Sequence, residues 1–86
     1  MYEIVMSVKV VKILQKIPKP DAERFMQKLG IIAKDPYAPL PFVKRLRGCQ
    51  NFRFRFGNYR GVYTVIDKIL KIIVIDIAHR REIYRR

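Results

Sequence analysis

The chain has 86 residues, of which 19 are Lys or Arg and 7 are Asp or Glu, so its net charge is +12. This length favours one small domain over residues 1–86 and leaves no room for a second core. A hydrophobic content of 50% excludes intrinsic disorder. No apolar run approaches the roughly 18 residues of a membrane span, and no signal peptide is visible. The single cysteine, Cys49, excludes an intramolecular disulfide, so we expect a protein of the reducing cytoplasm.

The first half of the chain predicts a strand and two short helices. Residues 2–6 are typical of a strand, and Ser7 is a suitable N-cap for the helix that follows. Apolar residues recur in this helix at steps of three, at Val8, Val11, Leu14 and Ile17. Pro20 fits the first turn of a second helix that extends to about residue 34. Its expected apolar positions are Ala22, Phe25, Met26, Leu29, Ile32 and Ala33.

The second half predicts an antiparallel meander after an irregular, proline-rich connector at 35–41. Phenylalanines alternate there with polar residues, which is typical of a strand with one buried face. The expected strands are 51–56, 59–66 and 69–78, joined by turns at Gly57–Asn58 and Asp67–Lys68. The order β-α-α-β-β-β therefore predicts an α+β fold, in which an antiparallel sheet carries the helical hairpin on one face.

The positive charge is concentrated in the second half of the chain. Residues 1–43 carry a net charge of +3 and one arginine, whereas residues 44–86 carry +9 and nine arginines. Arginine is the better bidentate ligand for phosphate. The distribution favours a polyanion, above all nucleic acid, as the partner of the second half. Solubility or the charge enrichment of a thermophile is the alternative explanation.

A turn at Gly57–Asn58 predicts a face rich in arginine. Arg55 would pair with Arg60, and both would lie with Arg53 on the face opposite the phenylalanines, because successive side chains of a strand alternate. Like charges directly opposite each other destabilise a sheet, which favours an anion bound between them. The alternative is an ordinary solvated face.

The same face is expected to carry the apolar residues Val62, Ile73 and Ile75. An exposed apolar strip on a sheet is a liability for aggregation. We therefore expect either a protein partner or the C-terminal tail of the chain to cover it.

The whole chain, and most strongly residues 45–84, resembles the RelE branch of the RelE/ParE superfamily of toxins from toxin–antitoxin pairs. The resemblance lies in three elements taken together: Leu46-Arg47-Gly48, Tyr59-Arg60-x-x-Tyr63 and His79-Arg80-x-x-x-Tyr84. It implies a messenger-RNA endonuclease that enters the ribosomal decoding site and needs no metal or other cofactor. The alternatives are a ParE-like inhibitor of DNA gyrase with the same fold and a non-catalytic RNA-binding domain.

The resemblance implies a catalytic set of Arg53, Arg55, Arg60, Arg80 and Tyr84. RNA carries its own nucleophile, the 2′-hydroxyl, so the enzyme must supply a base, charge stabilisation and an acid. Tyr84 would be the base, with its pKa lowered by the surrounding arginines. Arg55 and Arg60 would hold the phosphate. Arg80 or Arg53 would support the leaving oxygen, and His79 is the alternative acid, since histidine is a common general acid.

Other basic residues would bind RNA or the ribosome: Lys44, Arg45, Arg47, Arg81, Arg85 and Arg86. The expected partners are the ribosome, messenger RNA and an acidic, RelB-like antitoxin that would neutralise the arginines, and no membrane is expected. The prediction as a whole requires guanidinium groups from distant segments to meet around one phosphodiester.

Overall fold

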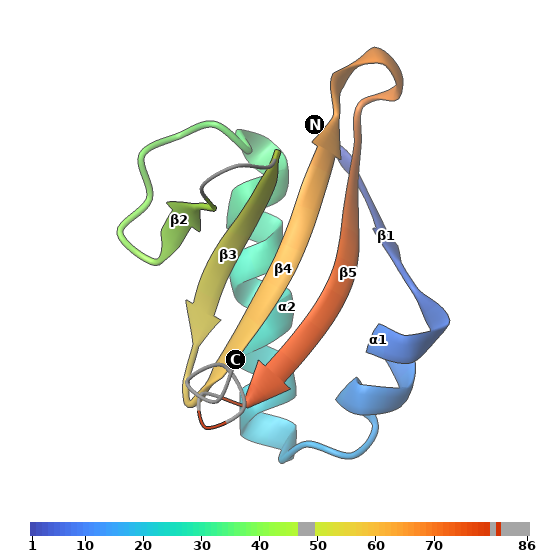
Figure 1. Cartoon of the computed structure of the whole chain (residues 1–86), viewed down its shortest axis with the longest axis vertical. Helices are drawn as coiled ribbons and strands as arrows, with labels where there is room; N and C mark the ends of the chain where they lie inside the picture. The colour runs from blue at the N-terminus through green and yellow to red at the C-terminus, as the bar shows by residue number, and fades with distance from the viewer. Residues whose placement is uncertain (47–49, 80, 82–86) are drawn as a thin grey trace.

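The computed structural model describes residues 1–46, 50–79 and 81 of the chain (Figure 1). Its elements are β1 (Glu3–Met6), α1 (Val8–Leu14), α2 (Lys19–Lys34), β2 (Val43–Arg45), β3 (Asn51–Phe56), β4 (Tyr59–Ile66), a 3-10 turn η1 (Asp67–Ile69) and β5 (Lys71–His79). The strands form one five-stranded sheet in the order β1-β5-β4-β3-β2. The predicted α+β class is therefore confirmed. None of the described helices is long and apolar enough to cross a membrane.

The sheet differs from the predicted antiparallel meander in two ways. The opening strand β1 pairs in parallel with the last strand, with Glu3 opposite Lys71. A further short strand, β2, pairs with β3, with Lys44 opposite Arg53. Parallel pairing needs a long crossover, which the two helices and the rest of the chain supply. With three residues, β2 is too short to show an alternating pattern in the sequence.

The first hairpin forms as predicted, and the second turn does not. Gly57 has a φ of +59°, the left-handed conformation that glycine adopts without steric cost, and Phe56 pairs with Tyr59 across the turn. The predicted two-residue turn at Asp67–Lys68 is wrong. The chain makes the 3-10 turn η1 instead, with Leu70 left-handed at a φ of 51°, so β5 begins at Lys71.

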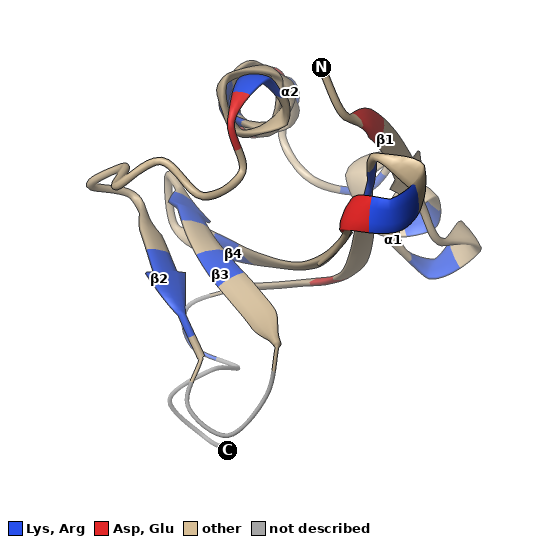
Figure 2. Cartoon of the chain, turned by 90° about the horizontal axis from the view of Figure 1, so that it is seen from above, with Lys and Arg blue, Asp and Glu red and all other residues tan. Residues whose placement is uncertain are grey.

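The core lies between the helices and one face of the sheet. Seen from above, α2 lies on one side of the curved sheet (Figure 2). Phe25 on α2 packs against Phe54 and Phe56, with ring centroids 5.6 and 5.1 Å apart. The side chains fully shielded from solvent are Tyr63, Phe25, Phe54, Phe56, Leu29, Ile32, Ile72, Val10 and Val74.

Two details of the predicted helix faces are corrected. In α1 the buried residue is Val10, whereas Val8 is 71% exposed. This short helix carries two overlapping apolar stripes, so its periodicity cannot choose between them. In α2, Met26 is 48% exposed although it follows the buried Phe25 directly. The predicted caps are confirmed: the Ser7 hydroxyl accepts a hydrogen bond from the Val10 amide, and Pro20 lies in the first turn of α2.

One buried polar group leads to a stability prediction. The Tyr63 hydroxyl is shielded from solvent and has no hydrogen-bond partner among the described residues, and its burial raises its pKa to about 12. An unpaired buried hydroxyl costs about 1–3 kcal/mol. Replacing Tyr63 with phenylalanine is therefore expected to raise the free energy of unfolding by about 1 kcal/mol, measured by urea denaturation. A destabilised variant would show that this hydroxyl is paired in solution.

Candidate nucleic-acid interface

Four basic side chains from three strands share the face of the sheet opposite α2. The register places Lys44 opposite Arg53 and Arg55 opposite Arg60. Because Arg53 and Arg55 are two residues apart on β3, their side chains project from the same face. We call Lys44, Arg53, Arg55 and Arg60 the basic face. The cross-strand pairing of two arginines is the arrangement that the hairpin turn predicted.

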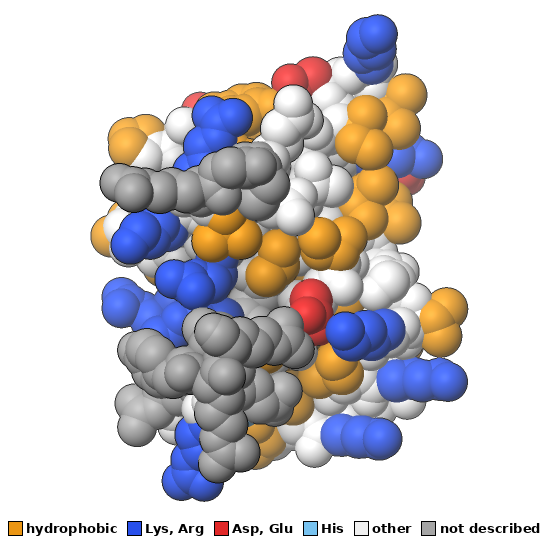
Figure 3. All heavy atoms as spheres, in the orientation of Figure 1, with side chains coloured by type: hydrophobic (Ala, Val, Ile, Leu, Met, Phe, Trp, Pro, Cys, Tyr) orange, Lys and Arg blue, Asp and Glu red, His pale blue; other side chains and the backbone are white. Residues whose placement is uncertain are grey.

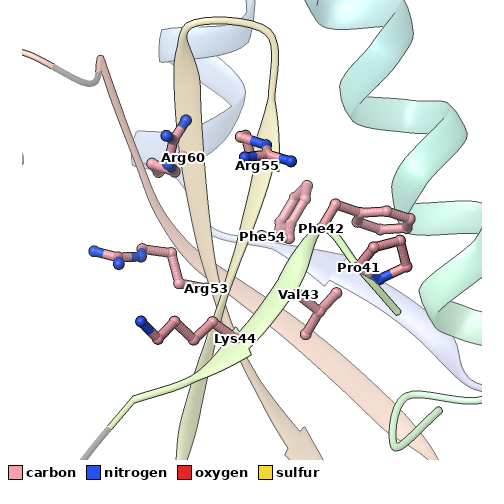
Figure 4. A pocket seen from close by; sticks show the side chains of 8 residues that line it. All are labelled: Pro41, Phe42, Val43, Lys44, Arg53, Phe54, Arg55 and Arg60. Carbon is pink, nitrogen blue, oxygen red and sulfur yellow. The ribbon is translucent and has the colours of Figure 1, made fainter. Parts of the chain in front are cut away.

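The basic face borders a shallow hollow of about 190 Å³ at the edge of the sheet. Figure 4 shows Arg55 and Arg60 side by side near the hairpin turn, and Lys44 and Arg53 extending together further along the strands. The hollow is lined by Pro41, Phe42, Val43, Lys44, Arg53, Phe54, Arg55 and Arg60. In the space-filling view, Lys and Arg side chains gather on the left part of this face (Figure 3).

The backbone around Arg55 is fixed from outside the hairpin. Its amide donates a hydrogen bond to the Phe42 carbonyl at 2.9 Å. Its carbonyl accepts one from Lys28 Nζ on α2 at 2.7 Å. Arg60 is held in turn by a hydrogen bond from its Nη1 to the Tyr59 carbonyl at 3.0 Å. These hydrogen bonds therefore hold the two opposing arginines in defined positions.

Lys28 adds a fifth cation near the basic face, and sequence reasoning missed it. Its Nζ lies 4.8 Å from the centroid of the Phe42 ring. Burial lowers the pKa of Lys28, and the positive charges of Arg55, Arg24 and Arg60 lower it further. In the sequence, Lys28 is one of several lysines expected on the solvated faces of the two helices. Nothing in the sequence therefore indicates that it lies near the basic face.

The apolar residues predicted on the arginine-bearing face also lie there. Val62 pairs with Arg53, and Ile73 pairs with Thr64 on the same side. Ile75 is 37% exposed, next to an irregularity in the β4–β5 register. Apolar side chains are visible in the middle of this face (Figure 3). These residues lie on the predicted face although the second turn was predicted wrongly. The strand β5 begins two residues later than expected, and a shift of two residues leaves each side chain on the same face of the sheet.

Other predicted site residues lie elsewhere or outside the described part of the chain. Arg45 projects to the side of the sheet that carries Phe52, and its guanidinium lies 5.6 Å from the centroid of that ring. His79 packs edge-on against Tyr59, with ring centroids 5.1 Å apart. Arg81 is exposed, and its amide donates a hydrogen bond to His79 Nδ1. The residues outside the described ranges are Arg47, Arg80, Tyr84, Arg85 and Arg86.

His79 is poorly placed for the alternative role of general acid. It pairs with Tyr59, whereas the neighbouring Arg60 pairs with Ala78. Adjacent positions of a strand face opposite sides, so His79 lies on the other side of the sheet from Arg60. Within the described ranges, no three His, Cys, Asp or Glu side chains meet as metal ligands would.

A second polar cluster joins the N-terminus to the turn after β4. The Tyr2 hydroxyl donates to Asp67 Oδ1 at 2.8 Å, and the Tyr37 hydroxyl donates to Asp67 Oδ2 at 2.7 Å. These bonds, first that from Tyr2 and then that from Tyr37, lower the pKa of Asp67. The bond to Asp67 also raises the pKa of Tyr2 to about 12 and raises the pKa of Tyr37.

This cluster predicts how stability depends on pH. The contribution of Asp67 is present above its ordinary pKa of 3.8 and is lost as pH falls through the lowered value. The contribution of Tyr2 is present below pH 10.0 and is lost as pH rises towards 12. The stability difference between the native chain and an Asp67→Asn variant is therefore expected to be constant from about pH 5 to 9 and to shrink outside that window. Thermal unfolding across pH measures it, and a difference that persists at about pH 2 would contradict it.

The family described as ParE toxin of type II toxin-antitoxin system, parDE, matches residues 4–84 of the chain. The chain therefore belongs to the RelE/ParE superfamily and is a toxin of a type II toxin–antitoxin system. The α+β class and the helical hairpin, which the order of elements predicted, agree with this family.

Individual relatives agree with this family. The chain is 28% identical over 79 residues to an Escherichia coli protein whose name describes it as a RelE-like toxin; the match covers 92% of this chain and 83% of that protein. The toxin fold in the crystal structure of the archaeal RelE-RelB complex from Pyrococcus horikoshii OT3 superimposes with a TM-score of 0.81 and 31% identity, over 92% of this chain and 94% of that chain. The isolated E. coli RelE toxin, at 21% identity, has the same fold, with a TM-score of 0.81 over 99% and 98% of the two chains.

Proposed function

We propose that this toxin is an endoribonuclease that cuts messenger RNA on the ribosome and thereby inhibits translation. The observation that carries the proposal is the direct cross-strand pairing of Arg55 and Arg60, flanked by Lys44 and Arg53. Four cations on one face repel one another, and a bound phosphate relieves that repulsion. The 31% identity to the archaeal toxin supports the RelE branch.

The proposed reaction needs no protein nucleophile. The 2′-oxygen attacks the adjacent phosphorus, the bond to the 5′-oxygen breaks, and a 2′,3′-cyclic phosphate and a 5′-hydroxyl result. Arg55 and Arg60 bind the non-bridging oxygens, whose charge grows in the transition state. Tyr84 takes the proton from the 2′-hydroxyl as its base. Arg80, or Arg53 on the basic face, stabilises the leaving 5′-oxygen, which takes up a proton from a solvent water molecule.

The proposed partners follow from the same face. We propose an acidic, RelB-like antitoxin that covers Val62, Ile73 and Ile75 and neutralises the basic face. The similar toxins of Pyrococcus horikoshii and E. coli crystallised in RelE–RelB complexes. A toxin that acts on ribosomes in this way would act in the cytoplasm. Arg45, Arg47, Arg81, Arg85 and Arg86 would contact RNA or the ribosome outside the reacting phosphate.

Mapping the ends of messenger RNA tests this function. Purified toxin is added to ribosomes stalled on a defined message, and the expected fragments end in a 2′,3′-cyclic phosphate. A Tyr84→Phe variant should bind the ribosome but cut about 10²- to 10⁴-fold more slowly, the usual contribution of a positioned base. Undiminished cutting would remove Tyr84 from the mechanism. Binding without any cutting would leave a non-catalytic RNA-binding toxin.

One observation favours a second function. The family that matches residues 4–84 is named for ParE toxins, and the proposed alternative is inhibition of DNA gyrase. A supercoiling assay with purified gyrase separates the two functions. Inhibition of supercoiling together with intact messenger RNA would replace the proposed nuclease by the gyrase inhibitor.

A further inference from the structure

A second hollow lies on the other side of the short edge strand β2. Its volume is about 190 Å³, and it is lined by Tyr37, Arg45, Gln50, Phe52, Val65 and Asp67. None of these residues belongs to the basic face. The hollow therefore needs its own explanation.

The charges of this hollow do not suit a phosphate. Arg45 supplies one positive charge, and the carboxylate of Asp67 supplies one negative charge. A carboxylate repels a phosphate, in contrast to the basic face, where every charged group is a cation. The lining instead suits an uncharged planar group that carries hydrogen-bonding atoms along its edge.

Two flat side chains are held in place at this hollow. Tyr37 is 53% exposed, yet its ring is fixed by an edge-on contact with Phe52, 6.0 Å between centroids, and by its hydroxyl bond to Asp67. The guanidinium of Arg45 lies over the Phe52 ring. Exposed aromatic rings and guanidinium planes are the surfaces on which unpaired bases stack. Little conformational entropy is lost on binding, because both groups are already positioned.

Hydrogen-bonding groups are available beside these planes. Gln50 carries an amide with both donors and an acceptor. Each oxygen of Asp67 accepts one tyrosine hydroxyl and keeps a further lone-pair site. These groups match the donors and acceptors at the edge of a nucleobase.

The hollow and the basic face are joined by two consecutive residues of β2. Lys44 pairs with Arg53, and the next residue, Arg45, pairs with Phe52. Neighbouring residues of a strand lie about 3.8 Å apart and face opposite sides. We propose that an RNA strand with a phosphate on the basic face turns around the edge of β2 and places one unpaired base in the hollow between Tyr37, Arg45 and Asp67. This inference rests on the proposed function and adds a base-binding site to it.

The test compares two uncut oligonucleotides. Short single-stranded RNA with 2′-O-methyl groups lacks the nucleophile, and a matched oligonucleotide has one abasic position. By fluorescence anisotropy the native chain is expected to bind the base-bearing strand about 5- to 150-fold more tightly than the abasic one, the usual value of one stacked base. Tyr37→Phe keeps the ring and should keep most of this preference, whereas Tyr37→Ala should abolish it. Arg45→Leu should lower the preference, because it removes the guanidinium plane over Phe52. Lys12→Leu on α1 loses the same charge and should keep the preference.

A direct contact readout keeps the test independent of folding defects. The chain contains no tryptophan, so Tyr37→Trp introduces a single tryptophan in the hollow, whose fluorescence can be excited apart from that of the tyrosines. The base-bearing strand should quench it and the abasic strand should not. Equal binding of both strands with no quenching would overturn the base site while leaving the proposed nuclease intact. Failure of both strands to bind would also overturn the base site, whereas the nuclease, which acts on the ribosome, is judged separately by cutting of the stalled message.

Discussion

Replacing Arg60 with leucine is expected to slow cleavage of ribosome-bound messenger RNA by about 10²- to 10³-fold, the usual cost of removing one donor to a developing oxyanion. Arg60 lies opposite Arg55 and is oriented by its bond to the Tyr59 carbonyl. Lysine at this position should restore only part of the rate, because an ammonium cannot form the bidentate contact. Single-turnover cleavage on stalled ribosomes measures the effect.

The control for this experiment must separate charge from fold. Lys12→Leu on α1 removes one positive charge far along the chain from the basic face and should leave the rate within about twofold. Arg60→Leu should unfold at nearly the native temperature, because Arg60 is not part of the buried core. Equal loss of activity in the two variants would mean that only net charge matters.

Replacing Gly61 with alanine is expected to have the largest effect on stability. A Cβ at this position would lie 2.6 Å from Cζ of Phe54 and 3.1 Å from its Cδ1. Phe54 cannot yield easily, because its ring is fully buried between Phe25, Phe56 and Tyr63. Overpacking of this kind costs about 1–3 kcal/mol, a large share of the stability of a chain this short. Urea denaturation measures the loss.

Two further variants show whether this contact is the cause. Combining Gly61→Ala with Phe54→Leu should cost less than the two single losses added, because the smaller side chain makes room for the new methyl group. Gly30→Ala is the matched control, since a Cβ there meets nothing within 4 Å. In the interior of α2 it should stabilise the chain by about 0.5–1 kcal/mol. Destabilisation by both alanines would point to a general intolerance of glycine replacement.

The sequence predicted the parts of the fold that depend on near neighbours. The alternation of Phe52, Phe54 and Phe56 with polar residues defined a strand, and Gly57–Asn58 set the register of the first hairpin. The parallel pairing of β1 with β5 could not be predicted from the sequence, because it joins segments at opposite ends of the chain. Local periodicity carries no information about which distant edge a strand will join.

The same division applies to the candidate site. The pairing of Arg55 with Arg60 followed from the turn, because strand register decides which residues face each other. The position of Lys28 and the cluster of Tyr2, Tyr37 and Asp67 did not follow, since they join a helix, the N-terminus and two loops. A charge in the sequence marks a candidate residue, and only tertiary packing decides what it meets.

The position of β5 has a consequence for synthesis of the toxin. β5 lies in the sheet between β1, the first strand made, and β4. A nascent chain that lacks β5 leaves two strand edges without partners, which is a state open to mispairing with other chains. The sheet is completed only after β5 has been made, because β5 joins β1 to β4. Its completion requires closure of the long loop between β1 and β5, and long-range pairing of this kind slows folding.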